Sequence, residues 1–208
     1  MEIVLARHGE TEWSKDGRHT GRTDIPLTEN GRREALQLGE ALEEWSLVRV
    51  LSSPLQRALE TCRLAGLGDQ VETTEDLLEW DYGDYEGITT AQIRESRPDW
   101  SLWRDGCPGG ETAADVGRRV DRVIAELEGI EGDVAVFAHG HVLRVMAARW
   151  VGLGPECGAL LALNTGTLSV LGYERETRVV RRWNAPVRAA GTAPRSAPPA
   201  ARTARPRR

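Results

Sequence analysis

Arginine and histidine side chains follow three short apolar runs of the chain. The residues concerned are Arg7, His8 and Gly9 after I-V-L-A at 3–6, Arg57 after V-R-V-L-S-S at 48–53, and His139, Gly140 and His141 after D-V-A-V-F-A at 133–138. A planar guanidinium group binds two anion oxygens at once, and a neutral imidazole acts as a nucleophile. Glycine lets the backbone come close to a bound group. This combination suits the binding and covalent capture of a phosphoryl group.

The apolar runs before these residues have the composition of buried strands, and helical patterns separate them. We predict strands at 3–6, 48–53, 133–138, 167–173 and 178–183, the last two near the sheet edge, and helices at 31–45, 54–65, 89–96, 111–128 and 141–152. Thr28 is the expected N-cap of the first helix, and Pro54 the first residue of the second. The alternation predicts an α/β fold of three α/β/α layers with a mainly parallel sheet. Ligands of such sheets bind beyond the carboxyl ends of the strands, where the Arg and His side chains would meet.

A phosphoryl transfer also needs an acid that protonates the leaving oxygen. The stretch L-L-E-W-D-Y-G-D-Y-E-G at 77–87 offers four carboxyl groups, those of Glu79, Asp81, Asp84 and Glu86. Carboxyl groups close to one another and to a phosphate dianion keep their protons to higher pH, so we expect one of them to be protonated at roughly pH 6. Trp80, Tyr82 and neutral groups are expected to contact the rest of a substrate.

Four motifs resemble those of the histidine phosphatase superfamily, the group of cofactor-dependent phosphoglycerate mutases and related phosphatases. They are R-H-G-E-T at 7–11, S-P-L-Q-R-A at 53–58, the L-x-E-x-x-x-G-x-x-E-G pattern at 77–87 and A-H-G-H at 138–141. They occur in the family's order, and the resemblance implies a phosphoglycerate mutase-like fold. Because Arg7 and Arg57 supply the charge that a metal ion would supply, we expect neither a metal nor a cofactor.

The resemblance also implies what each site residue does. His8 would be the phosphorylated nucleophile, Arg7, Arg57 and His139 would bind the phosphoryl group, and Glu79 would be the proton donor. The expected substrate-binding residues are Ser14, Thr20, Gly21, Tyr82 and Gly140. Many family members have Asn at the position of Ser14, whose hydroxyl also donates to phosphate. His141 is expected to support its neighbours; the alternative is a His139-x-His141 metal pair, which has no carboxylate or Cys at ligand spacing beside it.

The region after Glu79 favours a phosphatase over a mutase. Family mutases typically carry Arg after the acid, Lys about ten residues later and an Arg-Arg pair in an insert, whereas this chain has Trp80, Thr90 and no such pair between 88 and 111. Residues 79–100 and 103–112 resemble two subgroups, actinobacterial acid phosphatases with mutase-like names and fungal sedoheptulose-1,7-bisphosphatases. We therefore expect a phosphomonoesterase acting on small phosphate esters such as sugar phosphates. A phosphoglycerate mutase is the first alternative, and a metal-dependent hydrolase or a non-catalytic phosphate-binding module is the alternative of another class.

Composition limits the partners and the location of the protein. Residues 188–208 hold six Arg and no acidic residue, so residues 1–187 carry a net charge of −11 against −5 for the whole chain. We predict one domain at 1–187, too acidic to bind nucleic acid, and a disordered Pro/Ala/Arg-rich tail at 188–208. No apolar run is long enough for a membrane span. Three widely spaced cysteines favour the reducing cytoplasm, and a homodimer is compatible with the sequence.

Overall fold

The computed structural model of the protein describes residues 1–187; the predicted tail at 188–208 lies outside the described residues. Its central sheet has six strands in the order β3-β2-β4-β1-β5-β6. The strands are β1 (Ile3–Arg7), β2 (Leu47–Ser52), β3 (Val71–Thr73), β4 (Asp133–Ala138), β5 (Thr167–Glu174) and β6 (Thr177–Pro186). The first four are parallel, and β5 and β6 add antiparallel pairs at one edge. The mainly parallel sheet is confirmed.

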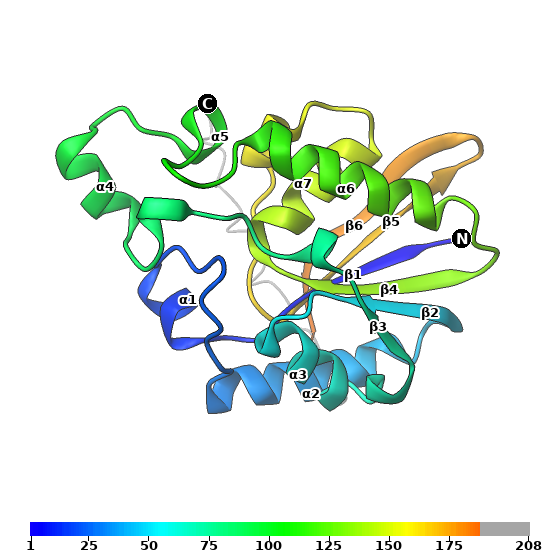
Figure 1. Ribbon diagram of the computed structural model, residues 1–208. Helices are drawn as coiled ribbons and strands as arrows, with labels where there is room; N and C mark the ends of the chain where they lie inside the picture. The colour runs from blue at the N-terminus through cyan, green and yellow to red at the C-terminus, as the bar shows by residue number, and fades with distance from the viewer. Residues whose placement is uncertain (188–208) are drawn as a thin grey trace, which may run out of the picture.

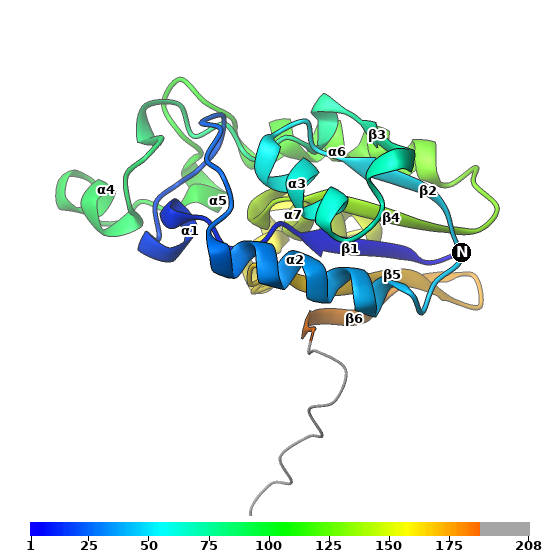
Figure 2. The same ribbon diagram turned by 90° about the horizontal axis from the view of Figure 1, so that it is seen from below.

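Helices cover both faces of this sheet. On one face lie α2 (Glu29–Leu42) and α3 (Gln56–Leu64), and on the other α6 (Ala113–Leu127) and α7 (Gly140–Trp150) (Figures 1 and 2). Alternate side chains of β1 point to opposite faces of the sheet. Ile3 and Leu5 pack in the core under α6 and α7, and Val4 and Ala6 pack in the core under α2 and α3. This gives the predicted three layers. No helix in the described part of the chain has the length and apolar character to cross a membrane.

The observed starts of helices α2 and α3 can be compared with the predicted ones. Thr28 caps α2 as predicted, and its hydroxyl oxygen accepts a hydrogen bond from Gly31 N at 3.0 Å. The second helix was predicted to begin at Pro54, which is wrong: α3 begins at Gln56. Leu55, the N-cap of α3, has extended backbone angles (φ −67°, ψ 136°), so the chain stays extended for one residue beyond the proline.

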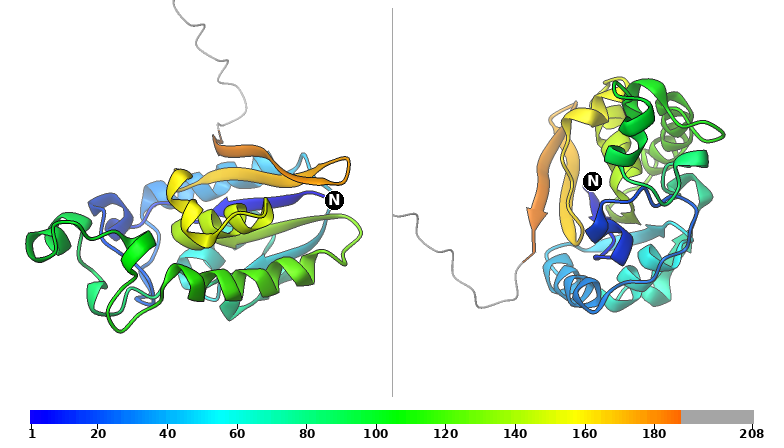
Figure 3. Two further views of the ribbon diagram at one scale, coloured as in Figure 1. Left: turned by 90° about the horizontal axis from the view of Figure 1, so that it is seen from above. Right: turned by 90° about the vertical axis from the view of Figure 1, so that its left-hand side faces the viewer.

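The parallel strands end side by side, as the site prediction requires. Arg7 at the end of β1 pairs with Ala138 at the end of β4, and Ser52 of β2 pairs with Phe137. Beyond these ends lie three short helices, α1 (Glu12–Asp16), α4 (Thr90–Ser96) and α5 (Leu102–Asp105) (Figures 1 and 3). Helix α4 was predicted, whereas helices α1 and α5 and strand β3 were not.

Candidate active site

A cavity of about 270 Å³ lies at the end of β1 and the start of α7. Seven of the predicted site residues line it: Arg7, His8, Ser14, Thr20, Glu79, Tyr82 and Gly140. The other three, Arg57, His139 and Gly21, are buried and are not part of the lining. The fold therefore gathers side chains from distant parts of the sequence around one cavity.

His8 is held as a neutral imidazole with one nitrogen engaged. Its Nδ1 lies 2.7 Å from the carbonyl oxygen of Gly9, which only accepts, so Nδ1 carries the proton and Nε2 keeps its lone pair. Burial, followed by the charges of Arg57 and Arg7, holds the pKa of His8 well below 6.5. A neutral imidazole with a free lone pair in a cavity is suited to nucleophilic attack.

Arg7 brings an unsatisfied donor to the cavity. Its Nη1 donates to the carbonyl oxygen of Leu163, whereas its Nε is the one buried side-chain nitrogen or oxygen within residues 1–187 that lacks a hydrogen-bond partner. Gly140 packs against this guanidinium group, and a Cβ there would lie 3.2 Å from Arg7 Cζ. A buried donor without a partner costs about 1–3 kcal/mol. An anion in the cavity would satisfy it.

Arg57 and His139 form a buried polar pair next to His8. Arg57 Nε donates to His139 Nδ1 at 3.1 Å, so His139 carries its proton on Nε2, which lies 2.7 Å from Ser53 Oγ. The Nη atoms of Arg57 donate to backbone carbonyls of the loop at 20–23. The ring centroids of His8 and His139 are 5.1 Å apart. Burial and the charge of Arg57 hold the pKa of His139 well below 6.5.

Glu79 is the one carboxyl group of the stretch 77–87 that lines this cavity. Its oxygens accept hydrogen bonds from the backbone N–H groups of Trp80 at 2.9 Å, His141 at 2.9 Å and Val142 at 3.0 Å. Two of these donors belong to the first turn of α7. The side chain is therefore fixed between its own loop and a helix N-terminus.

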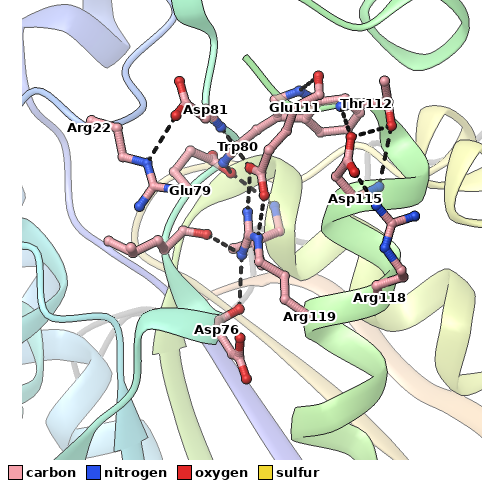
Figure 4. Close-up of polar contacts among 12 residues, drawn as sticks. Arg22, Asp76, Glu79, Trp80, Asp81, Glu111, Thr112, Asp115, Arg118 and Arg119 are labelled. Atoms are coloured by element: carbon pink, nitrogen blue, oxygen red, sulfur yellow. Dashed lines mark hydrogen bonds and ion pairs between the residues drawn. The ribbon is translucent and has the colours of Figure 1, made fainter. Parts of the chain in front are cut away.

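The other candidate acids, Asp81, Asp84 and Glu86, are not part of the lining. The carboxylate of Glu86 accepts hydrogen bonds from Gly21 N at 2.8 Å and Thr23 N at 3.0 Å. Asp81 lies 3.4 Å from Arg22 in an ion pair (Figure 4). Gly21 packs tightly on this segment, since a Cβ there would lie 2.5 Å from the Trp80 carbonyl oxygen. Glu86 and Gly21 thus join the two loops, while Glu79 faces the cavity.

Tyr82 lines the cavity, and Trp80 does not. The Tyr82 hydroxyl lies 2.7 Å from His141 Nδ1, and burial, the largest cause, raises the pKa of Tyr82 well above 10. His141 therefore contacts a neutral phenol beside Glu79. Trp80 is fully buried in the core, where its Nε1 donates to the carbonyl oxygen of Glu111 at 2.9 Å. The expectation that Trp80 contacts a substrate is wrong.

Ser14 and Thr20 line the cavity with hydroxyl groups that already have backbone partners. Ser14 stands in the first turn of α1, where its Oγ accepts a hydrogen bond from Thr11 N at 2.9 Å in a capping box and also donates to the Thr11 carbonyl oxygen at 2.9 Å. Thr20 Oγ1 donates to the carbonyl oxygen of Arg18 at 3.1 Å. Both residues shape the wall of the cavity, and their contact with a phosphate stays a prediction.

Two further guanidinium groups line the cavity, those of Arg18 and Arg144. Arg144 lies over the ring of Trp103, with its Cζ 4.6 Å from the ring centroid, and its Nε donates to the Gly158 carbonyl oxygen at 3.0 Å. The expectation of neutral groups around the rest of the substrate is therefore wrong. Because His141 and Arg144 are three residues apart in the predicted helix at 141–152, they share a helix face, and this spacing could have indicated that Arg144 lies at the site. The lining also contains His141, which was expected to support its neighbours, and Gly17, His19, Thr90 and Leu163, which were not among the predicted site residues.

All four histidines have a lowered pKa, which makes the fold sensitive to acid. Burial is the largest cause; it lowers the pKa of His19 from 6.5 to about 4 and that of His8, His139 and His141 well below 6.5. Below about pH 6.5 the unfolded chain binds protons that the folded protein does not. The free energy of unfolding therefore decreases as the pH is lowered. Each histidine removes roughly 1 kcal/mol between about pH 7 and 5.5.

We therefore expect the urea midpoint to be clearly lower at about pH 5.5 than at about pH 7. Histidine in the unfolded chain takes up its proton in roughly this pH range. The variant His19→Asn should show a weaker pH dependence because it lacks one of these groups. Equal midpoints of the wild type at both pH values would contradict the prediction.

Among residues 1–187, no group of three or more His, Cys, Asp and Glu side chains is placed to hold a metal ion. The alternative of a His139-x-His141 metal pair is not supported, since both ring nitrogens of His139 contact protein groups, Arg57 and Ser53. The Nδ1 of His141 contacts Tyr82.

The chain matches known proteins along most of its length. Residues 3–186 match the model of the histidine phosphatase superfamily (branch 1). An acid phosphatase of Mycobacterium tuberculosis is 46% identical over 180 residues, covering 85% of this chain and 88% of that protein. Sedoheptulose 1,7-bisphosphatase of Saccharomyces cerevisiae is 41% identical over 185 residues, covering 74% of this chain and 68% of that protein. A solved structure from an open reading frame of M. tuberculosis has a TM-score of 0.86 at 43% identity and covers 90% of this chain and 98% of that one.

The fold and the cavity together are those of an α/β enzyme whose site lies at the carboxyl ends of parallel strands. The chain belongs to the histidine phosphatase superfamily. The predicted family and fold class are confirmed, and the chain is an enzyme of the histidine phosphatase type.

Proposed function

We propose that the protein hydrolyses small phosphorylated metabolites through a phosphohistidine intermediate on His8. The observation that carries this proposal is a neutral His8 with a free Nε2 lone pair beside Arg7, whose buried Nε has no partner. A phosphoryl group in the cavity satisfies the Arg7 donor and presents its phosphorus atom to the imidazole. The names of the two relatives, an acid phosphatase and a sugar bisphosphatase, support the same reaction class.

In the first proposed step, Nε2 of His8 attacks phosphorus and the bond from phosphorus to the leaving oxygen breaks. Glu79 gives its proton to that oxygen, so a neutral alcohol leaves and Glu79 becomes a carboxylate. The three backbone N–H donors around Glu79 stabilise that carboxylate. Arg7, with the charge of the adjacent Arg57, offsets the charge that develops on the phosphoryl oxygens.

In the second proposed step, a water molecule attacks the phosphorus atom of phosphohistidine. The Glu79 carboxylate accepts the proton of that water, the bond between phosphorus and Nε2 of His8 breaks, and inorganic phosphate leaves. His8 returns to the neutral form, which its lowered pKa favours even in mild acid. The same carboxyl group thus acts as acid and then as base.

We propose a phosphorylated sugar as the substrate, with sedoheptulose 1,7-bisphosphate as the preferred candidate. Support comes from the yeast relative and from Arg18 and Arg144 in the cavity wall, since two guanidinium groups suit a second anionic group on the substrate. The three cysteines are free thiols, two of them buried, which supports the cytoplasm as the compartment.

An assay with 3-phosphoglycerate and 2,3-bisphosphoglycerate separates the phosphatase from the mutase. We expect slow release of inorganic phosphate and little 2-phosphoglycerate, because Trp80 and Thr90 stand where the mutases of this family carry cationic residues. A sugar phosphate measured beside them should be hydrolysed faster. Efficient isomerisation without phosphate release would identify a mutase instead.

A further inference from the structure

A buried ion pair between Arg119 and Glu111 brackets the loop that carries Glu79 (Figure 4). Arg119 stands on α6, and Glu111 lies just before that helix begins. Arg119 Nε and Nη2 donate to the two carboxylate oxygens of Glu111 at 2.8 and 3.0 Å. The Arg119 side chain is 8% exposed and that of Glu111 17%, so the pair is largely removed from water.

The remaining bonds of this pair go to the backbone on both sides of Glu79. Before it, Arg119 Nη1 donates to the carbonyl oxygens of Asp76 at 2.8 Å and Leu78 at 2.6 Å. After it, Glu111 Oε2 accepts a hydrogen bond from Asp81 N at 2.8 Å. The backbone of Glu111 also donates to the Asp81 carbonyl oxygen at 2.9 Å. The segment that holds Glu79 is therefore fixed at both ends by one buried pair.

The pair itself is attached to the rigid part of the molecule. Thr112 caps α6 through a capping box with Asp115, directly after Glu111. Arg119 neighbours Val116 and Val120, which are fully buried in the core under α6. A buried ion pair contributes little net stability compared with apolar residues of the same volume, because both charges lose their hydration. What this pair supplies and apolar residues cannot is a set of directed donors and acceptors for the loop.

We propose that Arg119 and Glu111 are positioning residues for the proton transfer by Glu79, which rests on the proposed function. They hold the loop so that the Glu79 carboxyl group faces the cavity from between its own backbone and the N-terminus of α7. A proton donor displaced by about 1 Å loses much of its effect. The consequence depends on the leaving group, because an alkoxide needs the proton far more than a phenolate does.

The test compares kcat/KM of Arg119→Lys for glucose 6-phosphate and for p-nitrophenyl phosphate. Lysine keeps the charge but cannot make the fork to Glu111 and the two carbonyl bonds together. We expect kcat/KM to fall about tenfold or more for glucose 6-phosphate and about twofold or less for p-nitrophenyl phosphate. Glu111→Gln, which keeps the size of the side chain, should shift the ratio in the same direction. Arg118→Lys is the matched control: its ion pair with Asp115 on the same helix is exposed, and it should leave both values unchanged.

The double variant Arg119→Lys/Glu79→Gln separates this inference from the proposed function. If Arg119 acts through Glu79, the double variant discriminates between the two substrates no more than Glu79→Gln alone. A Glu79→Gln variant without discrimination would contradict the acid function of Glu79 itself. Two results would overturn the positioning proposal if Glu79→Gln does discriminate between the substrates. One is an equal loss of kcat/KM on both substrates in Arg119→Lys and Glu111→Gln. The other is a fully additive loss in the double variant. Melting temperatures of all variants identify any loss that comes from unfolding alone.

Discussion

The variant His8→Ala is expected to lose turnover and covalent phosphate together. Wild-type enzyme, mixed with a ³²P-labelled substrate and quenched, should carry phosphate that is labile in acid and stable in base, as a phosphoramidate bond is. The variant should carry none, because Nε2 of His8 is the atom that forms this bond. Loss of a nucleophile typically lowers kcat by about 10⁴-fold or more, so residual turnover should be close to background.

Two controls distinguish a loss of the nucleophile from a loss of folding. The melting temperature of His8→Ala should stay close to or above that of the wild type at mildly acidic pH, because a buried neutral histidine has been removed. Added imidazole should restore part of the turnover of p-nitrophenyl phosphate by acting in the vacated space. If a folded His8→Ala protein kept wild-type turnover, the phosphohistidine mechanism would be wrong. If neither the wild type nor the variant turned over substrate, a non-catalytic binding module would be favoured.

The strand ends of the site were predictable because their signals are local. A buried parallel strand is an uninterrupted apolar run, and the residue after it must lie at the carboxyl edge of the sheet. Two such runs, at 3–6 and 133–138, therefore placed Arg7, His8 and His139 together before any pairing was known. The observed register, with Arg7 opposite Ala138, has this arrangement.

The parts that were not predicted depend on contacts between distant residues. Helix α1 has five residues and α5 four, too few for a periodic pattern, and packing fixes them. Arg57 was assigned from its motif, but nothing in the sequence indicated that its Nη atoms donate to carbonyls of the loop at 20–23. Trp80 sits beside Glu79 in the sequence, yet Trp80 is fully buried and only Glu79 lines the cavity. One faces the cavity and the other the core.

The pair of Arg119 and Glu111 shows the same limit for charged residues. Arg118 and Arg119 are adjacent arginines of the same helix, and composition alone predicts that both side chains are exposed. In the fold, Arg118 is exposed, whereas Arg119 is buried against the acid loop. Helical periodicity places Arg119 near Val116 and Val120, on the buried side of the helix. Its partners 41 and 43 residues away are set by tertiary structure alone.

The variant Glu79→Gln is expected to discriminate strongly between leaving groups. Glutamine keeps the shape of the side chain but has no proton to give, so an alkoxide must leave unassisted. For glucose 6-phosphate, kcat/KM should fall by about 10²–10⁴-fold, the usual contribution of a general acid. For p-nitrophenyl phosphate it should fall by less than about tenfold, because the phenolate is a stable anion and kcat/KM reports only the steps up to its departure.

The same variant should also reveal the second function of the carboxyl group. Without a base for the attacking water, phosphohistidine should accumulate, and p-nitrophenolate should appear as a burst of about one equivalent per site, followed by a slow steady rate. Asp84→Asn is the matched control, since Asp84 lies on the same stretch and outside the cavity lining; it should show neither discrimination nor a burst. Equal losses of kcat/KM on both substrates in Glu79→Gln, with no burst, would remove Glu79 from the proton transfer. The role of proton donor would then move to another acid of the stretch 77–87, which is Asp81, Asp84 or Glu86.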